Sequence, residues 1–318
     1  MFRLTFVVMV LAACGAKDPS SSTIVDAQIS TSVDAPRTPS DGPITGAIDP
    51  ADDGSSMVSE TTASIPGATS DHTLAATIYT PSGVTAPALV VISPGFQMAR
   101  TQYASYAHHL ATWGFKVILT DYADSGFFAD HQMMANDVGA VITYALALTP
   151  SIDSTKIALA GHSLGGDISV LAAAGDARVK AVVGWDPVDG SSPSVVPEKM
   201  TAFTAKLAVI GETTDATGGF MPCAPTANNF TQFYASAASP AYQLTVMGAD
   251  HMDWVDDGTC MFCTLCTAGT AAPELSHTTT RRLNVAWLRA QLFGDSMMTP
   301  WLMAPPEVAA GKASITTK

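Results

Sequence analysis

From about residue 70 onward, short apolar runs alternate with helix-length segments, and this alternation limits the folds open to the chain. The run 88–93, ALVVIS, is apolar up to its serine, as expected of a strand buried on both faces. Further runs predict strands at 74–79, 115–120, 156–160, 179–185, 206–210 and 242–247. Helical spacing predicts helices at 101–113, 134–148, from 164, and around 283–290 as the last helix. Strands that alternate with helices indicate an α/β protein, with a mostly parallel central sheet and helices on both faces.

The pentapeptide 161–165, GHSLG, lies between a predicted strand that ends at Ala160 and a predicted helix. It matches G-x-S-x-G, in which a sharp strand–turn–helix elbow exposes the serine hydroxyl above the sheet. Glycines flank the serine because side chains there would collide in so tight a turn. The alternative is a structural turn with an idle serine, but the position between strand and helix favours the elbow. We therefore predict the α/β-hydrolase fold with Ser163 as nucleophile, and no catalytic role for His162.

Two histidines, His251 and His277, follow Ser163 in the chain, and in this fold the histidine of the triad comes after the acid. His251 follows the strand 242–247 after a short loop, from which an imidazole can reach back to the serine and take its proton. His277 stands beside Ser276 at the start of a predicted helix, where a capping or exposed role is the simpler interpretation. His251 is the predicted general base.

Two aspartates compete for the role of the triad acid. Asp186 directly follows the strand 179–185, and Asp215 follows the next strand, at the position that many α/β hydrolases use. Either carboxylate could accept the imidazole N–H and stabilise the imidazolium. Asp189, in the segment DPVDG, fits a turn better than the triad. The spacing alone leaves Asp186 and Asp215 open.

Two backbone N–H groups are expected to form an oxyanion hole. One belongs to Leu164, the residue after the predicted nucleophile. The other should come from the loop SPGFQ that ends the strand 88–93, where Gly95 lets the backbone come close and Phe96 is the predicted donor. The alternative is that this loop is a simple strand-ending turn.

The N-terminus has the pattern of an export signal, with Arg3 before the apolar stretch 4–10. Residues 11–14, LAAC, resemble the lipobox of bacterial lipoproteins, which are cleaved before the cysteine and lipidated on it. An ordinary signal peptide with an incidental Cys14 is the alternative. We predict a signal peptide at 1–13, a lipidated, disordered tether at 14–60 and a catalytic domain at 61–318. The tether would hold the enzyme on a membrane of the bacterial cell envelope.

The cysteines beyond Cys14 are the disulfide candidates Cys223, Cys260, Cys263 and Cys266. Four cysteines in an exported chain suggest two disulfides with three possible pairings. The spacing C-x-x-C-x-x-C also fits a metal or iron–sulfur ligand set, which an oxidising compartment disfavours. Four aspartates at Asp250, Asp253, Asp256 and Asp257 lack a regular calcium-ligand spacing and favour a solvated loop. No metal site is predicted.

Four motifs, in this order, resemble the chlorophyllase family and its bacterial, dienelactone-hydrolase-like relatives among the α/β hydrolases. They are the elbow GHSLGG, the strand end VVGWDPVDG, the segment CAP that begins at Cys223, and the block HMDWVDD that begins at His251. The likeness spans about residues 88–290, and it departs at Leu164, where the plant enzymes tend to carry arginine. The segment SPGF that ends at Phe96 is also similar to the oxyanion segment of cutinase-like polyester hydrolases.

The resemblance implies Ser163, Asp186 and His251 as the triad, which favours Asp186 over Asp215. It implies cleavage of carboxylic esters through an acyl-enzyme, without implying chlorophyll as the substrate. A lipase or polyester hydrolase is the first alternative, and a catalytically inactive surface binding module of the same fold is the second.

The net charge of −13 argues against nucleic acid as a partner, because no basic stripe can neutralise phosphates. We expect a small-molecule or lipid-like ester substrate and no cofactor. The sequence does not indicate an oligomeric state.

Overall fold

The computed structural model describes residues 48–124, 126–148, 151–190, 193–216, 222–258 and 263–318. All of the described residues belong to one compact unit. Cys14 and Cys260 lie outside the described residues, so the signal peptide, lipidation and export stay predictions. Among the described residues, no helix combines the length and apolar character that a membrane span requires.

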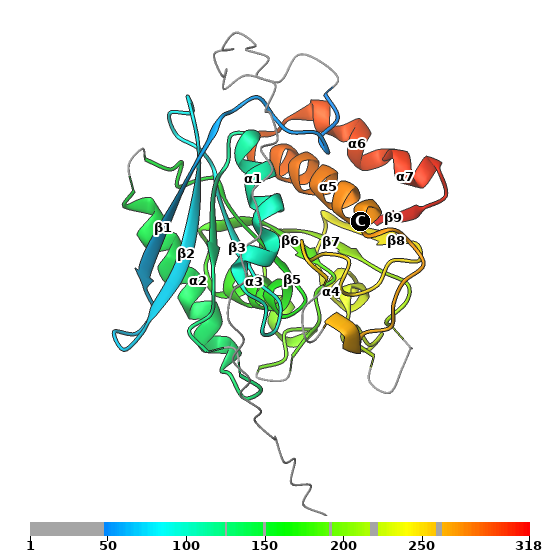
Figure 1. The fold of residues 1–318 in the computed structure, drawn as a ribbon, viewed down its shortest axis with the longest axis horizontal. Coiled ribbons are helices and arrows are strands. Elements are labelled where there is room, and N and C mark those ends of the chain that lie inside the picture. Colours follow the sequence, from blue (N-terminus) through cyan, green and yellow to red (C-terminus); the bar gives the residue numbers. More distant parts are fainter. Residues whose placement is uncertain (1–47, 125, 149–150, 191–192, 217–221, 259–262) are drawn as a thin grey trace, which may run out of the picture. The chain divides into compact units, whose positions relative to one another are not determined.

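One nine-stranded sheet runs through the described chain in the order β1-β2-β4-β3-β5-β6-β7-β8-β9 (Figure 1). The six strands from β4 to β8 in this order pair in parallel, while β1, β2 and β9 join antiparallel at the two edges. The bounds are β1 (Val58–Pro66), β2 (Thr73–Pro81), β3 (Leu89–Ser93), β4 (Lys116–Thr120), β5 (Ile157–His162), β6 (Val179–Trp185), β7 (Lys206–Gly211), β8 (Ala241–Val246) and β9 (Ala313–Thr317). The predicted α/β-hydrolase fold, with its mostly parallel sheet, is confirmed.

Helices cover both faces of this sheet (Figure 1). On one face lie α1 (Ala104–Thr112), α5 (Pro273–Phe293) and the short α6 (Thr299–Met303). On the other lie α2 (His131–Leu146), α3 (Leu164–Gly175) and α4 (Phe230–Ser236). The prediction that α5 is the last helix is wrong, because α6 and α7 (Pro306–Ala309) follow it and lead into β9.

The central strands are mostly apolar because both of their faces are buried. In β3, Val90 and Ile92 join the cluster that includes α1 and α5, whereas Leu89 and Val91 join the cluster that includes α2 and α3. All four side chains are fully buried. A central strand of a covered parallel sheet therefore lacks the alternation seen in a half-exposed one.

The parallel strands bring three loops to one edge of the sheet. β5 ends at His162, β6 ends at Trp185, and β8 ends a short loop before His251. Because the carboxyl ends of parallel strands share one edge, the elbow after β5, Asp186 after β6 and His251 after β8 lie along the same edge of the sheet. This edge is where the predicted site residues lie.

Candidate active site

Ser163 joins β5 to α3 through a strained turn. Its backbone has φ 54° and ψ −121°, in a region that residues other than glycine rarely adopt. Backbone hydrogen bonds hold the turn: the Ser163 N–H donates to the carbonyl of Trp185 at 3.0 Å, and the Ser163 carbonyl accepts from the N–H groups of Gly166 at 3.0 Å, Asp167 at 3.2 Å and Val188 at 3.3 Å. A serine that its hydrogen bonds hold in a strained conformation, at a junction of strand and helix, is typical of a nucleophile elbow.

Close backbone approach explains the two glycines of the pentapeptide. A Cβ atom on Gly165 would lie 2.1 Å from the carbonyl oxygen of Ser93, and one on Gly161 would lie 2.4 Å from the carbonyl oxygen of Gly165. Neither distance leaves room for a side chain. The elbow therefore packs directly on the loop that follows β3.

The structure brings Ser163, His251 and Asp186 into one hydrogen-bonded row. The Nε2 atom of His251 lies 2.9 Å from Oγ of Ser163, and its Nδ1 atom lies 2.6 Å from Oδ2 of Asp186. His251 is 5% exposed and Asp186 is fully buried. With the ring proton on Nδ1 and donated to Asp186, Nε2 is left as the acceptor for the serine hydroxyl.

Burial and charge act in opposite directions on this pair. Burial raises the pKa of Asp186, and the hydrogen bond and charge of His251 offset part of that rise. Burial works to lower the pKa of His251, but the hydrogen bond and charge of Asp186, helped by the charges of Asp215 and Glu212, bring it above its usual value of 6.5. The imidazolium form of His251 is therefore favoured by the carboxylates around it.

Asp215 has a different place from Asp186. Its two carboxylate oxygens accept backbone N–H groups, from His251 at 3.0 Å and from Thr267 at 2.8 Å. Asp215 thus holds the loop that carries His251, whereas Asp186 holds the ring. Of the other candidates, Asp189 accepts the Val195 N–H within its own loop at 2.8 Å.

His277 lies in the first turns of α5 and is not part of the row. Its Nε2 atom lies 3.2 Å from the carbonyl oxygen of Val255. Ser163 thus hydrogen-bonds with His251, whereas His277 contacts the backbone of a neighbouring loop.

The predicted oxyanion donors lie on two segments that touch. Leu164 is the first residue of α3, so its N–H has no acceptor within the helix. The loop after β3 packs on the elbow, since a Cβ atom on Gly95 would lie 3.1 Å from Nδ1 of His162. The ring of Phe96 packs on Phe127, with ring centroids 5.1 Å apart.

Backbone strain in the described part of the chain gathers at this site. Three non-glycine residues there have positive φ: Gln97 at 54°, Ser163 at 54° and Asp186 at 42°. The sequence motifs GHSLG and VVGWDPVDG mark Ser163 and Asp186. Strained residues persist where the surrounding structure over-determines them, which is common at functional sites.

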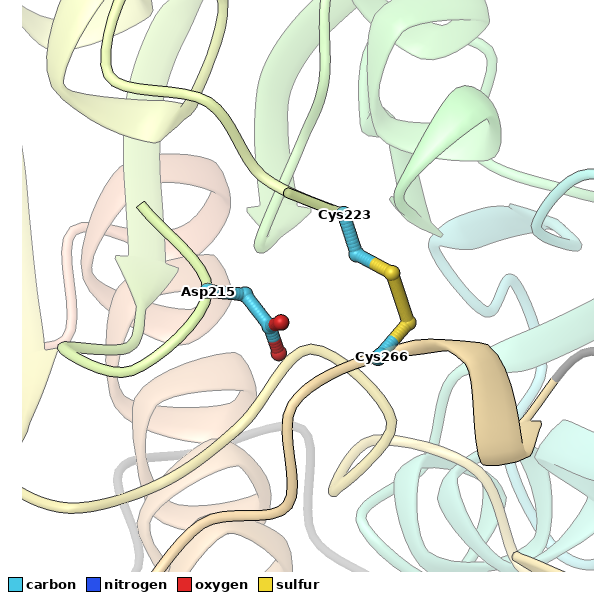
Figure 2. Close-up of side chains that lie close together, drawn as sticks. All are labelled: Asp215, Cys223 and Cys266. Atoms are coloured by element: carbon cyan, nitrogen blue, oxygen red, sulfur yellow. A yellow bond between two sulfur atoms is a disulfide. The ribbon is translucent and has the colours of Figure 1, made fainter. Parts of the chain in front are cut away.

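A disulfide joins Cys223, in the segment after β7, to Cys266, next to Thr267. Figure 2 shows the carboxylate of Asp215 beside this bond. Ligand atoms of the three residues lie within 4.8 Å of one another, but both sulfurs are bonded to each other and neither is a thiolate that could bind a metal. Cys263 is also disulfide-bonded. The prediction that Cys223 and Cys266 are disulfide cysteines is confirmed.

The aspartates after β8 bind backbone groups of their own and neighbouring segments. Asp250 accepts the N–H of Gly269 at 2.6 Å, and Asp256 accepts the N–H of Ser105 at 2.9 Å. Asp253 is 5% exposed, so the interpretation of the whole cluster as a solvated loop is wrong for this residue. These contacts fix the loop that carries His251.

Replacing both Cys223 and Cys266 with serine should lower the free energy of unfolding by about 2–4 kcal/mol. The bond spans 43 residues of chain, and its loss frees that segment in the unfolded state. Urea unfolding followed by circular dichroism measures the difference, with the double variant avoiding a leftover free thiol. An unchanged transition midpoint would contradict the expectation.

The nine-stranded sheet and the serine elbow define an α/β hydrolase. The family model described as Chlorophyllase matches residues 51–314, and the chain belongs to this family. It is 26% identical over 235 residues to Cutinase 1 of Thermobifida cellulosilytica, which covers 72% of this chain and 78% of the relative. It is also 26% identical to a cutinase of Thermobifida fusca (strain YX), in a match that covers 72% of this chain and 68% of the relative. It is 27% identical to Cutinase 2 of Thermobifida cellulosilytica, in a match that covers 72% of this chain and 78% of the relative. The resemblance found from the sequence motifs is confirmed.

Proposed function

We propose that this protein is a serine carboxylic-ester hydrolase that works through an acyl-enzyme. The observation that carries the proposal is the distance of 2.9 Å between Oγ of Ser163 and Nε2 of His251, on a strained elbow. Membership of the chlorophyllase family and similarity to cutinases support the ester bond as the target.

In the proposed reaction, Oγ of Ser163 attacks the ester carbonyl while Nε2 of His251 takes the hydroxyl proton. The tetrahedral intermediate places its negative oxygen toward the N–H groups of Leu164 and Phe96. When the C–O bond breaks, His251 gives its proton to the leaving alcohol. A water molecule then attacks the acyl-enzyme with His251 again as the base, and the acid and free Ser163 are released. Asp186 keeps the ring in the required tautomer and stabilises the imidazolium.

An apolar or insoluble ester is the second candidate, favoured by two exposed aromatic side chains. Phe127 is 74% exposed and Phe128 is fully exposed. Phe127 packs on Phe96, the proposed oxyanion donor, so this apolar surface borders the reacting carbonyl. Exposed aromatic rings beside a site favour contact with an apolar partner.

The test is covalent labelling of the protein by a fluorophosphonate, with the modified residue identified by mass spectrometry. We expect one phosphonyl group on Ser163, together with hydrolysis of p-nitrophenyl esters. A series from acetate to palmitate separates a small-ester hydrolase from an enzyme for apolar substrates, which would prefer the longer chains. A folded protein that is neither labelled nor active would favour a binding module and overturn the proposal.

The pH dependence of kcat/KM should show an acid limb with its midpoint above pH 6.5. His251 acts as a base only when neutral, and the surrounding carboxylates raise its pKa above 6.5. Activity is therefore lost as the pH falls through this raised pKa and is recovered above it. Initial rates with p-nitrophenyl acetate between pH 5 and 9 measure the midpoint. A midpoint below 6.5 would show that burial outweighs the carboxylates.

A further inference from the structure

His162, the residue before the proposed nucleophile, connects two other parts of the site. Its Nε2 atom lies 2.8 Å from the carbonyl oxygen of His251, and its Nδ1 atom lies 2.9 Å from the hydroxyl of Tyr103. The same hydroxyl lies 3.1 Å from the backbone nitrogen of Gly95. His162 is 1% exposed and Tyr103 is fully buried, so these bonds form away from water.

The direction of each hydrogen bond in this chain follows from its two ends. The Gly95 N–H can only donate, so the oxygen of Tyr103 accepts from it. The carbonyl of His251 can only accept, so His162 carries its proton on Nε2. Nδ1 of His162 is then an acceptor, and Tyr103 gives its single hydroxyl proton to it. A neutral His162 satisfies all three bonds, whereas a protonated ring would leave the buried hydroxyl proton of Tyr103 without this acceptor.

The surroundings keep His162 in this neutral form. Burial, and after it the nearby His251, lower the pKa of His162 well below 6.5. The two imidazole rings lie 4.8 Å apart between centroids. A neutral His162 adds no positive charge beside His251, which must become an imidazolium during the proposed reaction.

We propose that Tyr103 and His162 are positioning residues that hold the loop of the base and the oxyanion loop in register with the nucleophile. The inference rests on the proposed esterase function. His162 binds the main chain of His251, and Tyr103 binds the peptide N–H next to that of Phe96. The three groups that must meet one carbonyl are thereby tied to the rigid elbow between β5 and α3. Small displacements of such groups are costly, since about 1 Å can reduce a rate 100-fold.

Tyr103→Phe removes one oxygen, so the N–H of Gly95 and the Nδ1 atom of His162 each lose their hydrogen-bond partner. Tyr106→Phe is the matched control, because Tyr106 is equally buried, lies on the adjacent α1 and packs on the same Trp185. Within the described residues its hydroxyl has no hydrogen-bond partner. The two variants therefore lose the same atom, and only one of them loses contact with the site.

We expect Tyr103→Phe to lower kcat for p-nitrophenyl acetate by about 10- to 100-fold, with KM changed less than about twofold. Inhibition by phenylboronic acid, which mimics the tetrahedral intermediate, should weaken by a similar factor. Tyr106→Phe should keep the wild-type values. Equal kinetics for the two variants in an active enzyme would overturn the inference and leave the esterase proposal standing. An inactive, unlabelled wild type would instead overturn the esterase proposal itself.

Substitutions of His162 give an independent test if Tyr103→Phe does not fold. The side chain of His162→Gln can still donate to the His251 carbonyl and accept from Tyr103, whereas His162→Leu can do neither. We expect the glutamine variant to keep kcat within about threefold and the leucine variant to lose about 10-fold or more. Equal losses in both would contradict a role through these hydrogen bonds.

Discussion

Ser163→Ala is expected to lower kcat for ester hydrolysis by about 10⁶-fold, because no other group in the row can form the acyl-enzyme. His251 and Asp186 would remain paired through Nδ1 at 2.6 Å, yet without the serine oxygen they have no nucleophile to activate. A residual rate of about 10³ over the uncatalysed reaction would remain, since the oxyanion donors and substrate binding are unchanged. Initial rates with p-nitrophenyl butyrate measure the loss.

Ser169→Ala is the matched control for this substitution. Ser169 is also a buried serine close to the elbow, and its hydroxyl donates to the carbonyl of Gly165 at 2.7 Å, within α3. We expect the control to keep kcat within about threefold and to accept the fluorophosphonate label. Wild-type turnover by Ser163→Ala would remove the elbow serine from the mechanism.

The parts of the fold that the sequence predicts are those set by local pattern. Strands buried on both faces are continuous apolar runs, and the elbow needs glycines at 161 and 165 because the backbone of Ser93 occupies the space of a side chain. By contrast, most residues of β1 are exposed and polar or small, so nothing in Val58–Pro66 marks a buried strand. β9 is an edge strand that pairs only with β8 and is likewise without an apolar run.

The spacing alone does not distinguish Asp186 from Asp215 as the triad acid, because the difference between them lies in their contacts in space. Both follow neighbouring parallel strands, both are fully buried, and both reach the loop of His251. What separates them is which atom of His251 each contacts, ring or main chain, and spacing along the chain carries no such information. Tyr103 is even harder to identify from the sequence, because no motif marks it and 59 residues separate it from its contact His162.

Asp186→Asn is expected to lower kcat by about 10⁴-fold. An amide can present its N–H to Nδ1 of His251, which would place the ring proton on Nε2, facing Ser163. In that tautomer the ring cannot accept the hydroxyl proton, although the row of residues stays intact. Initial rates with the same ester, compared with those of Asp215→Asn, measure the effect.

Asp215→Asn makes the same chemical change on a carboxylate with a different task. Its two oxygens accept the N–H groups of His251 and Thr267, and an amide has only one oxygen to replace them. One buried N–H would lose its acceptor, at a cost of about 1–3 kcal/mol. We expect a lower melting temperature and a loss in kcat of about 10-fold, from a base loop that is less well placed.

The two substitutions should therefore move stability and activity in different proportions. Burial raises the pKa of Asp186, so the folded state binds its proton more tightly than the unfolded state does. The stabilisation from this group is therefore present at low pH and is lost as the pH rises through the folded-state pKa. At pH 8 the ionised Asp186 lowers the free energy of unfolding. A neutral amide removes that cost, so Asp186→Asn should melt at or above the wild-type temperature at pH 8 while it loses turnover. Asp215→Asn should melt lower and lose far less turnover. If instead Asp215→Asn loses about 10⁴-fold in kcat with an unchanged melting temperature, the role of triad acid passes to Asp215.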